Sequence, residues 1–346
     1  MSIRPSAYVA DSFVDYLESK EKELSSSTDY SERMNTQKQR NTIDRILNFL
    51  QCAKINTDLS ASRVENIYNP IAGNKNFQTM KEYLYHKALK NDLICNVSFE
   101  QSLTNNISFE KFIQETDDPN AVYFIPLDVA ESQIIQNKFG LVVIGNGFDF
   151  NSFYEDKNFA GKTISKGMDE ITVCKHPCNS LIIVDPYFFS GKNWKMNKAP
   201  GIIKIIKAFI LENLSLKFHL LILTEMDKSI SDYKPQINFL MECLGGNENL
   251  FMESYIDSSK IFSSDRLFIT NYAYINIGHP FDRETCLNST IFFSGNNQES
   301  IKENFDEQMK KIELIRDSIK KIPKTIGTIK TVLKTNEVDA NRLLYM

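Results

Sequence analysis

Hydrophobic residues recur at helical spacing through the first third of the chain. Three segments carry apolar side chains three and four residues apart, with polar runs between them: Ser12 to Leu24, Gln37 to Ala53 and Phe77 to Leu93. This periodicity predicts helices, and no run of β-branched residues interrupts it. We therefore expect a mainly helical N-terminal region covering residues 1–118.

The pattern changes at Ala121, where short apolar segments rich in β-branched and aromatic residues begin. These segments predict strands, and we expect the sheet to start there. They are Ala121 to Leu127, Leu141 to Ile144, Leu181 to Asp185, His219 to Thr224, Leu267 to Tyr272, Tyr274 to Ile277 and Thr290 to Phe293. Gly145 and Gly147 follow one of these strands and predict a turn with glycine at positive φ.

Helical spacing returns in three later segments: Gly201 to Leu214, Tyr233 to Leu244 and Gln298 to Lys321. Strand, helix and strand thus alternate, which predicts an α/β domain over residues 119–346. The last segment is amphipathic, with Glu and Lys alternating on its polar side. We interpret it as a solvated helix covering the sheet, and a partner-binding role is the alternative.

Composition is that of an ordinary globular protein, with 346 residues, 42% hydrophobic and 24% charged. This length suffices for one large domain or two smaller ones. The formal net charge of -4 argues against a surface that attracts nucleic acid everywhere, so any polyanion site must be local. No secretory signal begins the sequence, and apolar runs such as Leu181 to Val184 are too short to span a bilayer. We expect a cytoplasmic protein without membrane contact.

Six cysteines are scattered along the chain, which is typical of free, buried thiols in a reducing compartment. Cys174, His176 and Cys178 would offer three zinc ligands within five residues. Because no second Cys or His pair lies at a suitable distance, we expect a loop there, and no metal or cofactor. Walker, Rossmann, His-Glu-x-x-His and Gly-x-Ser-x-Gly motifs are absent from the sequence.

A spaced set of polar residues marks the segment from Ser264 to Asp282. Arg266, Asn271 and Gly278 follow Ser264 at offsets of two, seven and fourteen residues. These offsets resemble the signature of the phospholipase D superfamily, in which the four positions hold a nucleophilic His, a phosphate-binding Lys, an orienting Asp and a Gly. The resemblance implies a phospholipase D-like mixed sheet flanked by helices, with this segment crossing its centre.

A second piece of the resemblance is the apolar run that begins at Ser180 and ends in Asp185, Pro186 and Tyr187. It looks like the early strand of the family, which ends at the carboxyl edge of the sheet, where ligands of open α/β sheets bind. The two pieces lie within residues 179–293. They are also similar to phospholipase D-like domains appended to adaptor and trafficking proteins, which bind rather than cut.

The substitutions within the signature change its chemistry. Ser264 lacks the nucleophilicity and proton-carrying capacity of imidazole, so we expect no phosphoryl intermediate. Arg266 keeps the positive charge and offers a planar fork for phosphate or carboxylate, although a salt bridge to Asp185 or Asp265 is an equal alternative. Asn271 either contacts the ligand or, as we favour, caps a turn or bonds to backbone. His279 follows Gly278 and is a candidate replacement nucleophile, or else a hydrogen-bonded structural residue.

The segment after Asp185 and Tyr187 is basic and aromatic. Phe188 to Lys198 holds three lysines and the single tryptophan of the chain. Lys192, Trp194 and Lys195 would stack a base and grip a nucleic acid backbone, or the ring would instead be tucked into the core.

These features predict a catalytically degenerate, phospholipase D-like recognition or assembly module. Its expected ligand is a phosphate-bearing molecule, nucleic acid or an acidic partner surface, and a protein partner or homodimer is expected as well. Relics of nuclease folds are common in antiphage defence, which is an association only. The alternatives are an active phosphodiesterase or nuclease that uses His279, and a purely structural subunit of a larger complex.

Overall fold

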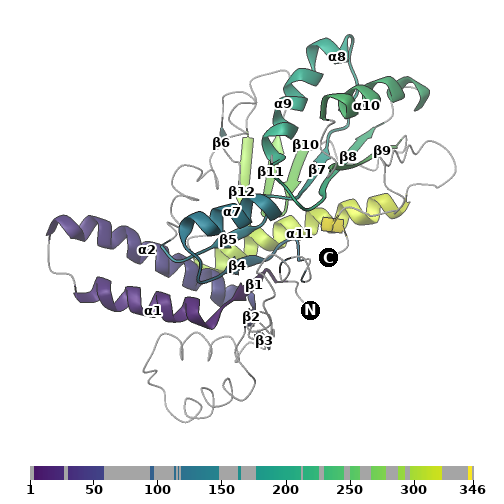
Figure 1. Cartoon of the computed structure of the whole chain (residues 1–346). Helices are drawn as coiled ribbons and strands as arrows, with labels where there is room; N and C mark the ends of the chain where they lie inside the picture. Colours follow the sequence, from purple (N-terminus) through teal and green to yellow (C-terminus); the bar gives the residue numbers. More distant parts are fainter. Residues whose placement is uncertain are drawn as a thin grey trace. The chain divides into compact units, whose positions relative to one another are not determined.

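The computed structural model describes residues 4–26, 30–57, 94–96, 113, 116, 118–147, 163–164, 177–211, 213–225, 230–244, 250–257, 266–277, 287–292, 297–321 and 342–344. The chain forms two compact units. Unit 1 comprises residues 1–136, 141–156 and 295–305, and unit 2 comprises residues 137–140, 157–294 and 306–346. Each unit is described by itself (Figure 1).

Unit 1 is built on a five-stranded sheet in which every neighbouring pair of strands is parallel. The strand order is β3-β2-β1-β4-β5. The strands are β1 (Ser6–Val9), β2 (Lys54–Thr57), β3 (Ile94–Asn96), β4 (Val122–Phe124) and β5 (Val142–Ile144). The connecting helices are α1 (Asp11–Ser26), α2 (Tyr30–Cys52) and α7 (Val129–Phe139), whose last three residues belong to unit 2.

Aromatic side chains hold this sheet to its helices. Phe13 of α1 packs on Phe124 of β4 with ring centroids 5.5 Å apart, and Phe49 of α2 lies 6.0 Å from the same ring. Tyr8 and Tyr123 stack across the β1–β4 pair at 5.0 Å. The helices predicted at Ser12 to Leu24 and Gln37 to Ala53 are confirmed, whereas the one predicted at Phe77 to Leu93 lies outside the described residues.

The expectation that the sheet starts at Ala121 is wrong, because β1 and β2 precede that residue. β1 lies at the centre of this sheet and pairs with β2 on one side and β4 on the other. Both strands have only four residues, and most of their side chains are buried. Such short, buried parallel strands show no alternation of polar and apolar residues. The helical periodicity of the segments on either side therefore led us to expect helices alone. The strands and the turn predicted at residues 121–147 are present, and Gly147 takes a φ of 77°.

Unit 2 is built on a seven-stranded mixed sheet in the order β6-β12-β11-β10-β7-β8-β9. β7 (Ser180–Val184), β8 (Phe218–Glu225) and β9 (Leu250–Asp257) are parallel to one another. The antiparallel part is β10 (Arg266–Thr270), β11 (Ala273–Ile277), β12 (Leu287–Ile291) and β6 (Thr163–Ile164). The chain therefore has the α/β class and mixed sheet expected from its sequence.

Helices flank this sheet, and one of its faces is covered by α8 (Trp194–Asn197), α9 (Ala199–Phe209) and α10 (Ile230–Leu244) (Figure 1). Leu181, Ile183, Ile222 and Phe268 of the sheet share a buried cluster with these helices. The predicted helix at Gln298 to Lys321 is α11, and its residues from Asp306 onward belong to unit 2.

β9 was not predicted, because its sequence LFMESYID includes Glu and Asp and shows no strand-like alternation. Its Glu253 is nevertheless 1% exposed, at a position paired with Leu221 of β8. Among the residues that the structure describes, no helix combines the length and apolarity needed to cross a bilayer.

Candidate functional site

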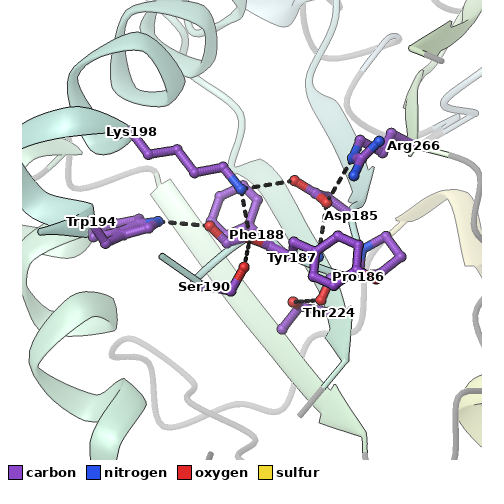
Figure 2. A network of polar contacts seen from close by, with 9 residues as sticks. All are labelled: Asp185, Pro186, Tyr187, Phe188, Ser190, Trp194, Lys198, Thr224 and Arg266. Atoms are coloured by element: carbon purple, nitrogen blue, oxygen red, sulfur yellow. Dashed lines mark hydrogen bonds and ion pairs between the residues drawn. The ribbon is translucent and has the colours of Figure 1, made fainter. Parts of the chain in front are cut away.

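Asp185 and Arg266 meet where β7 ends and β10 begins. Val184 pairs with Leu267 in the antiparallel ladder, so Asp185 and Arg266 are the next residues outward on the two strands. Arg266 Nε donates to Asp185 Oδ1 at 3.2 Å (Figure 2). Asp185 is fully buried and Arg266 is 8% exposed. Charges at such depth are stable only when paired, so this contact accounts for the burial of both groups.

Asp185 receives two further donors. The backbone N–H of Tyr187 donates to Oδ1 at 2.9 Å, and Lys198 Nζ donates to Oδ2 at 3.4 Å. The same Nζ donates to the Tyr187 carbonyl at 2.6 Å, so Lys198 ties the carboxylate to the following turn (Figure 2). One buried carboxylate thus organises two cations at the carboxyl edge of the parallel strands.

Hydrogen bonds from β8 fix the turn that follows Asp185. Thr224 Oγ1 and the Glu225 N–H both donate to the Pro186 carbonyl, at 3.1 Å each. The Asp185 N–H donates to Leu223 O at 3.0 Å. Because three contacts bind the turn to the end of β8, the position of Tyr187 is set by the sheet.

Tyr187 is exposed beside this buried pair and contacts Arg266. Tyr187 is 52% exposed, and the guanidinium carbon of Arg266 lies 5.6 Å from the centroid of its ring, within the range of a cation–π contact. The side-chain interactions of Arg266 with described residues are this contact and the Nε bond to Asp185. Its two terminal nitrogens, Nη1 and Nη2, therefore hold N–H donors that no described residue accepts.

Helix α9 begins at the same place. Lys198 is its N-cap residue and makes no side-chain cap, because an ammonium group cannot accept a hydrogen bond from the first N–H groups of the helix; its amine donates to Asp185. Pro200 occupies the first turn, where a missing N–H costs nothing. The positive end of the helix dipole therefore adds to the charge of Lys198 and Arg266.

Trp194 lies in the core beneath this surface. The ring is 2% exposed, its Nε1 donates to Phe188 O at 2.7 Å, and it packs 5.6 Å from the Phe189 ring. A ring so buried offers no face to a base, so of the two interpretations of Trp194 the structure supports the packed one. Lys192 and Lys195 are exposed, and Lys195 Nζ lies 5.0 Å from the centroid of the Phe239 ring.

Asn271 lies at the other end of the β7–β10 pair. Its Oδ1 accepts the N–H groups of Asn179 and Ser180 at 3.0 Å each, and its Nδ2 donates to Asn179 Oδ1 at 2.8 Å. Gln308 of α11 donates to the carbonyls of Thr270 and Asn271. Asn271 thus bonds to backbone, and the structure does not bring it to Asp185 and Arg266.

Other residues singled out in the sequence lie outside the described residues, namely Ser264, His279, Cys174 and His176. Cys178 is buried, and its Sγ donates to Phe209 O at 3.7 Å. Within the described ranges, no group of three or more His, Cys, Asp or Glu side chains is placed to hold a metal ion.

Lys198 and Thr224 were not singled out from the sequence. Lys198 ends the basic segment, but its contact with Asp185 depends on the turn that brings the start of α9 back to the strand end. Thr224 ends a predicted strand, which was the only signal available for it.

Comparison with known proteins identifies no relative, since no family model, no curated protein and no solved structure matches this chain.

Proposed function

We propose that this protein is a catalytically degenerate, phospholipase D-like recognition module that holds a phosphate-bearing ligand at the carboxyl edge of its seven-stranded sheet. One observation carries the proposal. Arg266 is held to Asp185 through Nε, and no residue that the structure describes accepts the N–H donors of its two terminal nitrogens.

The surroundings of Arg266 favour an anion over a neutral ligand. A guanidinium edge matches two oxygens of a phosphate or carboxylate, and charge-assisted bonds of this kind are among the strongest in proteins. Arg266 is 8% exposed, so the field of its charge is screened less than that of a surface arginine. Lys198 and the N-terminus of α9 add positive potential beside it.

The signature positions support binding without turnover. The first position is Ser264, which carries no imidazole for nucleophilic attack. Asn271, at the position of the orienting carboxylate, is committed to the opposite edge of the sheet.

The test is calorimetric titration with inorganic pyrophosphate at low salt. Arg266→Lys keeps a cation near Asp185 while removing the fork, and we expect its affinity to fall about tenfold, with Arg266→Gln falling further. Lys310→Gln on the exposed side of α11 is the matched control and should bind as the wild type does. Near-ultraviolet circular dichroism checks that each variant is folded.

Two kinds of result would overturn the proposal, a failure of the expected binding pattern and catalytic turnover. The first is absence of pyrophosphate binding by the wild type, or equal binding by Arg266→Lys. The second is turnover of bis(4-nitrophenyl) phosphate that His279→Ala abolishes, because the protein would then be a phosphodiesterase.

A further inference from the structure

We infer that the ligand is a single-stranded nucleic acid, whose backbone runs from Arg266 along the outer side of α8 and α9. This inference rests on the proposed function and names the ligand of the same site. The observation behind the inference is the positive charge of the segment that follows Asp185.

The segment of residues 186–211 contains five lysines and no acidic residue, in a chain whose net charge is -4. Four of the lysines are exposed, and the fifth, Lys198, reaches Asp185. The exposed ones are Lys192, Lys195, Lys204 and Lys207. This basic stretch directly follows Asp185, the partner of Arg266.

Helix α9 separates its apolar and basic sides. Ile202, Ile206 and Phe209 enter the buried cluster, whereas Lys204 and Lys207 are exposed. At a rise of 1.5 Å per residue, Lys207 lies about 14 Å along the helix from Lys198. A single phosphate cannot contact lysines spread over that length, whereas a chain of phosphates can.

Tyr187 distinguishes nucleic acid from other polyanions. One face of its half-exposed ring is covered by the Arg266 guanidinium, and the exposed remainder is available to a base. Met196, 80% exposed between Lys195 and Lys198, adds an apolar contact on the same segment. Aromatic rings beside a basic track are typical of single-strand sites, because a base stacks on a ring only when it is unpaired.

The experiment measures binding of a fluorescent oligodeoxythymidylate of about 12 nucleotides by anisotropy at several salt concentrations. The variant Lys192→Gln/Lys195→Gln/Lys207→Gln should weaken binding at least tenfold and reduce the slope of log K against log salt by about 2, since each phosphate contact on a single strand contributes about 0.7. Tyr187→Leu should weaken binding between about fivefold and a hundredfold with little change of slope. Lys310→Gln is again the control.

The pyrophosphate titration separates the two proposals. If pyrophosphate binds at Arg266 but the oligonucleotide binds no tighter and ignores the lysine changes, the inference is wrong and the proposed function stands. If neither binds, both are wrong. Lysine-dependent binding to phosphatidylserine vesicles without oligonucleotide binding would assign the basic face to a membrane surface and would also overturn the inference.

Discussion

The same two strands, β7 and β10, are joined by polar side chains at both ends, and the two ends differ in kind. At one end, Asn271 and Asn179 form a fully buried, neutral pair of amides. At the other, Asp185 and Arg266 form a buried ion pair that is bordered by the exposed ring of Tyr187. One end is closed by its own hydrogen bonds, whereas at the other no described residue accepts the terminal N–H donors of Arg266.

This difference separates a structural role, at Asn271, from the ligand-binding role that we propose for Arg266. Arg266 begins β10 and Asn271 directly follows its last residue, so an extended chain places these two residues about 17 Å apart. The hydrogen bonds of Asn271 fix β7 and β10 relative to each other at one end. At the other end, this fixed arrangement positions the Arg266 guanidinium beside Asp185. Substitutions at the amide end should therefore change stability alone.

The largest effect is expected for Asn271→Ala. It leaves the N–H groups of Asn179 and Ser180 buried without an acceptor, so the free energy of unfolding should fall by about 4 kcal/mol. Urea denaturation measures the change. Asn238→Ala, on the exposed side of α10, is the matched control and should stay within about 0.5 kcal/mol of the wild type. Equal losses in the two variants would contradict a specific role for the amide pair.

Asp185→Asn should lower stability by about 3 kcal/mol, because two cations lose the carboxylate that compensates them. Pyrophosphate affinity should be kept or increased, since a negative charge next to the anion site is removed. The pairing of lower stability with undiminished affinity distinguishes this variant from Arg266→Gln, in which both fall. A loss of affinity matching that of Arg266→Gln would show that Asp185 itself contacts the ligand.

Trp194→Phe should reduce the free energy of unfolding by about 1 to 2 kcal/mol, because the Phe188 carbonyl loses its indole donor. Oligonucleotide affinity should be unchanged, in contrast to Tyr187→Leu. Anisotropy and urea denaturation of the same preparations check both parts. A loss of oligonucleotide affinity similar to that of Tyr187→Leu would show that Trp194 contributes to ligand binding.

The smallest effect is expected in unit 1, where burial raises the pKa of Asp118 above 3.8 despite opposing hydrogen bonds from Ser6 and Asn120 and the charge of Lys54. The folded state therefore holds this proton more tightly than the unfolded state does. Ionisation of Asp118 therefore lowers the free energy of unfolding at a pH above the pKa of the folded state. This loss shrinks as the pH falls through that pKa, and it is gone below the pKa of the unfolded state. Asp118→Asn should accordingly gain less than about 1 kcal/mol at pH 7 and nothing below pH 4. A gain that is independent of pH would exclude ionisation as its cause.

Sequence periodicity predicted the elements with long or strongly apolar patterns, such as α11 and β8, because periodicity reports burial directly. It did not predict β1, which is only four residues long, or β9, which buries a glutamate. The conformation of those strands depends on pairing with neighbouring strands of the sheet, which the local sequence pattern does not indicate.

The sequence predicted which residues could form the candidate site, but not which contacts join them. The Asp185–Arg266 pair was one of two interpretations weighed from the sequence, and strand register decided that the pair forms. The role of Asn271 depended on the antiparallel direction of β10, which carries it away from the charged end. The contact of Lys198 with Asp185 depended on a turn between strand and helix, which no residue pattern specifies.

The solitary indole of the chain is a built-in optical probe of the proposed recognition surface. Trp194 is packed beside Phe189, and its N–H is bonded to the carbonyl of the residue next to Tyr187. Its emission therefore originates at one known place, shielded from solvent, under the ring that we expect to meet a base. Quenching or a spectral shift on titration would report events at that turn directly, with no dye attached and no substitution made.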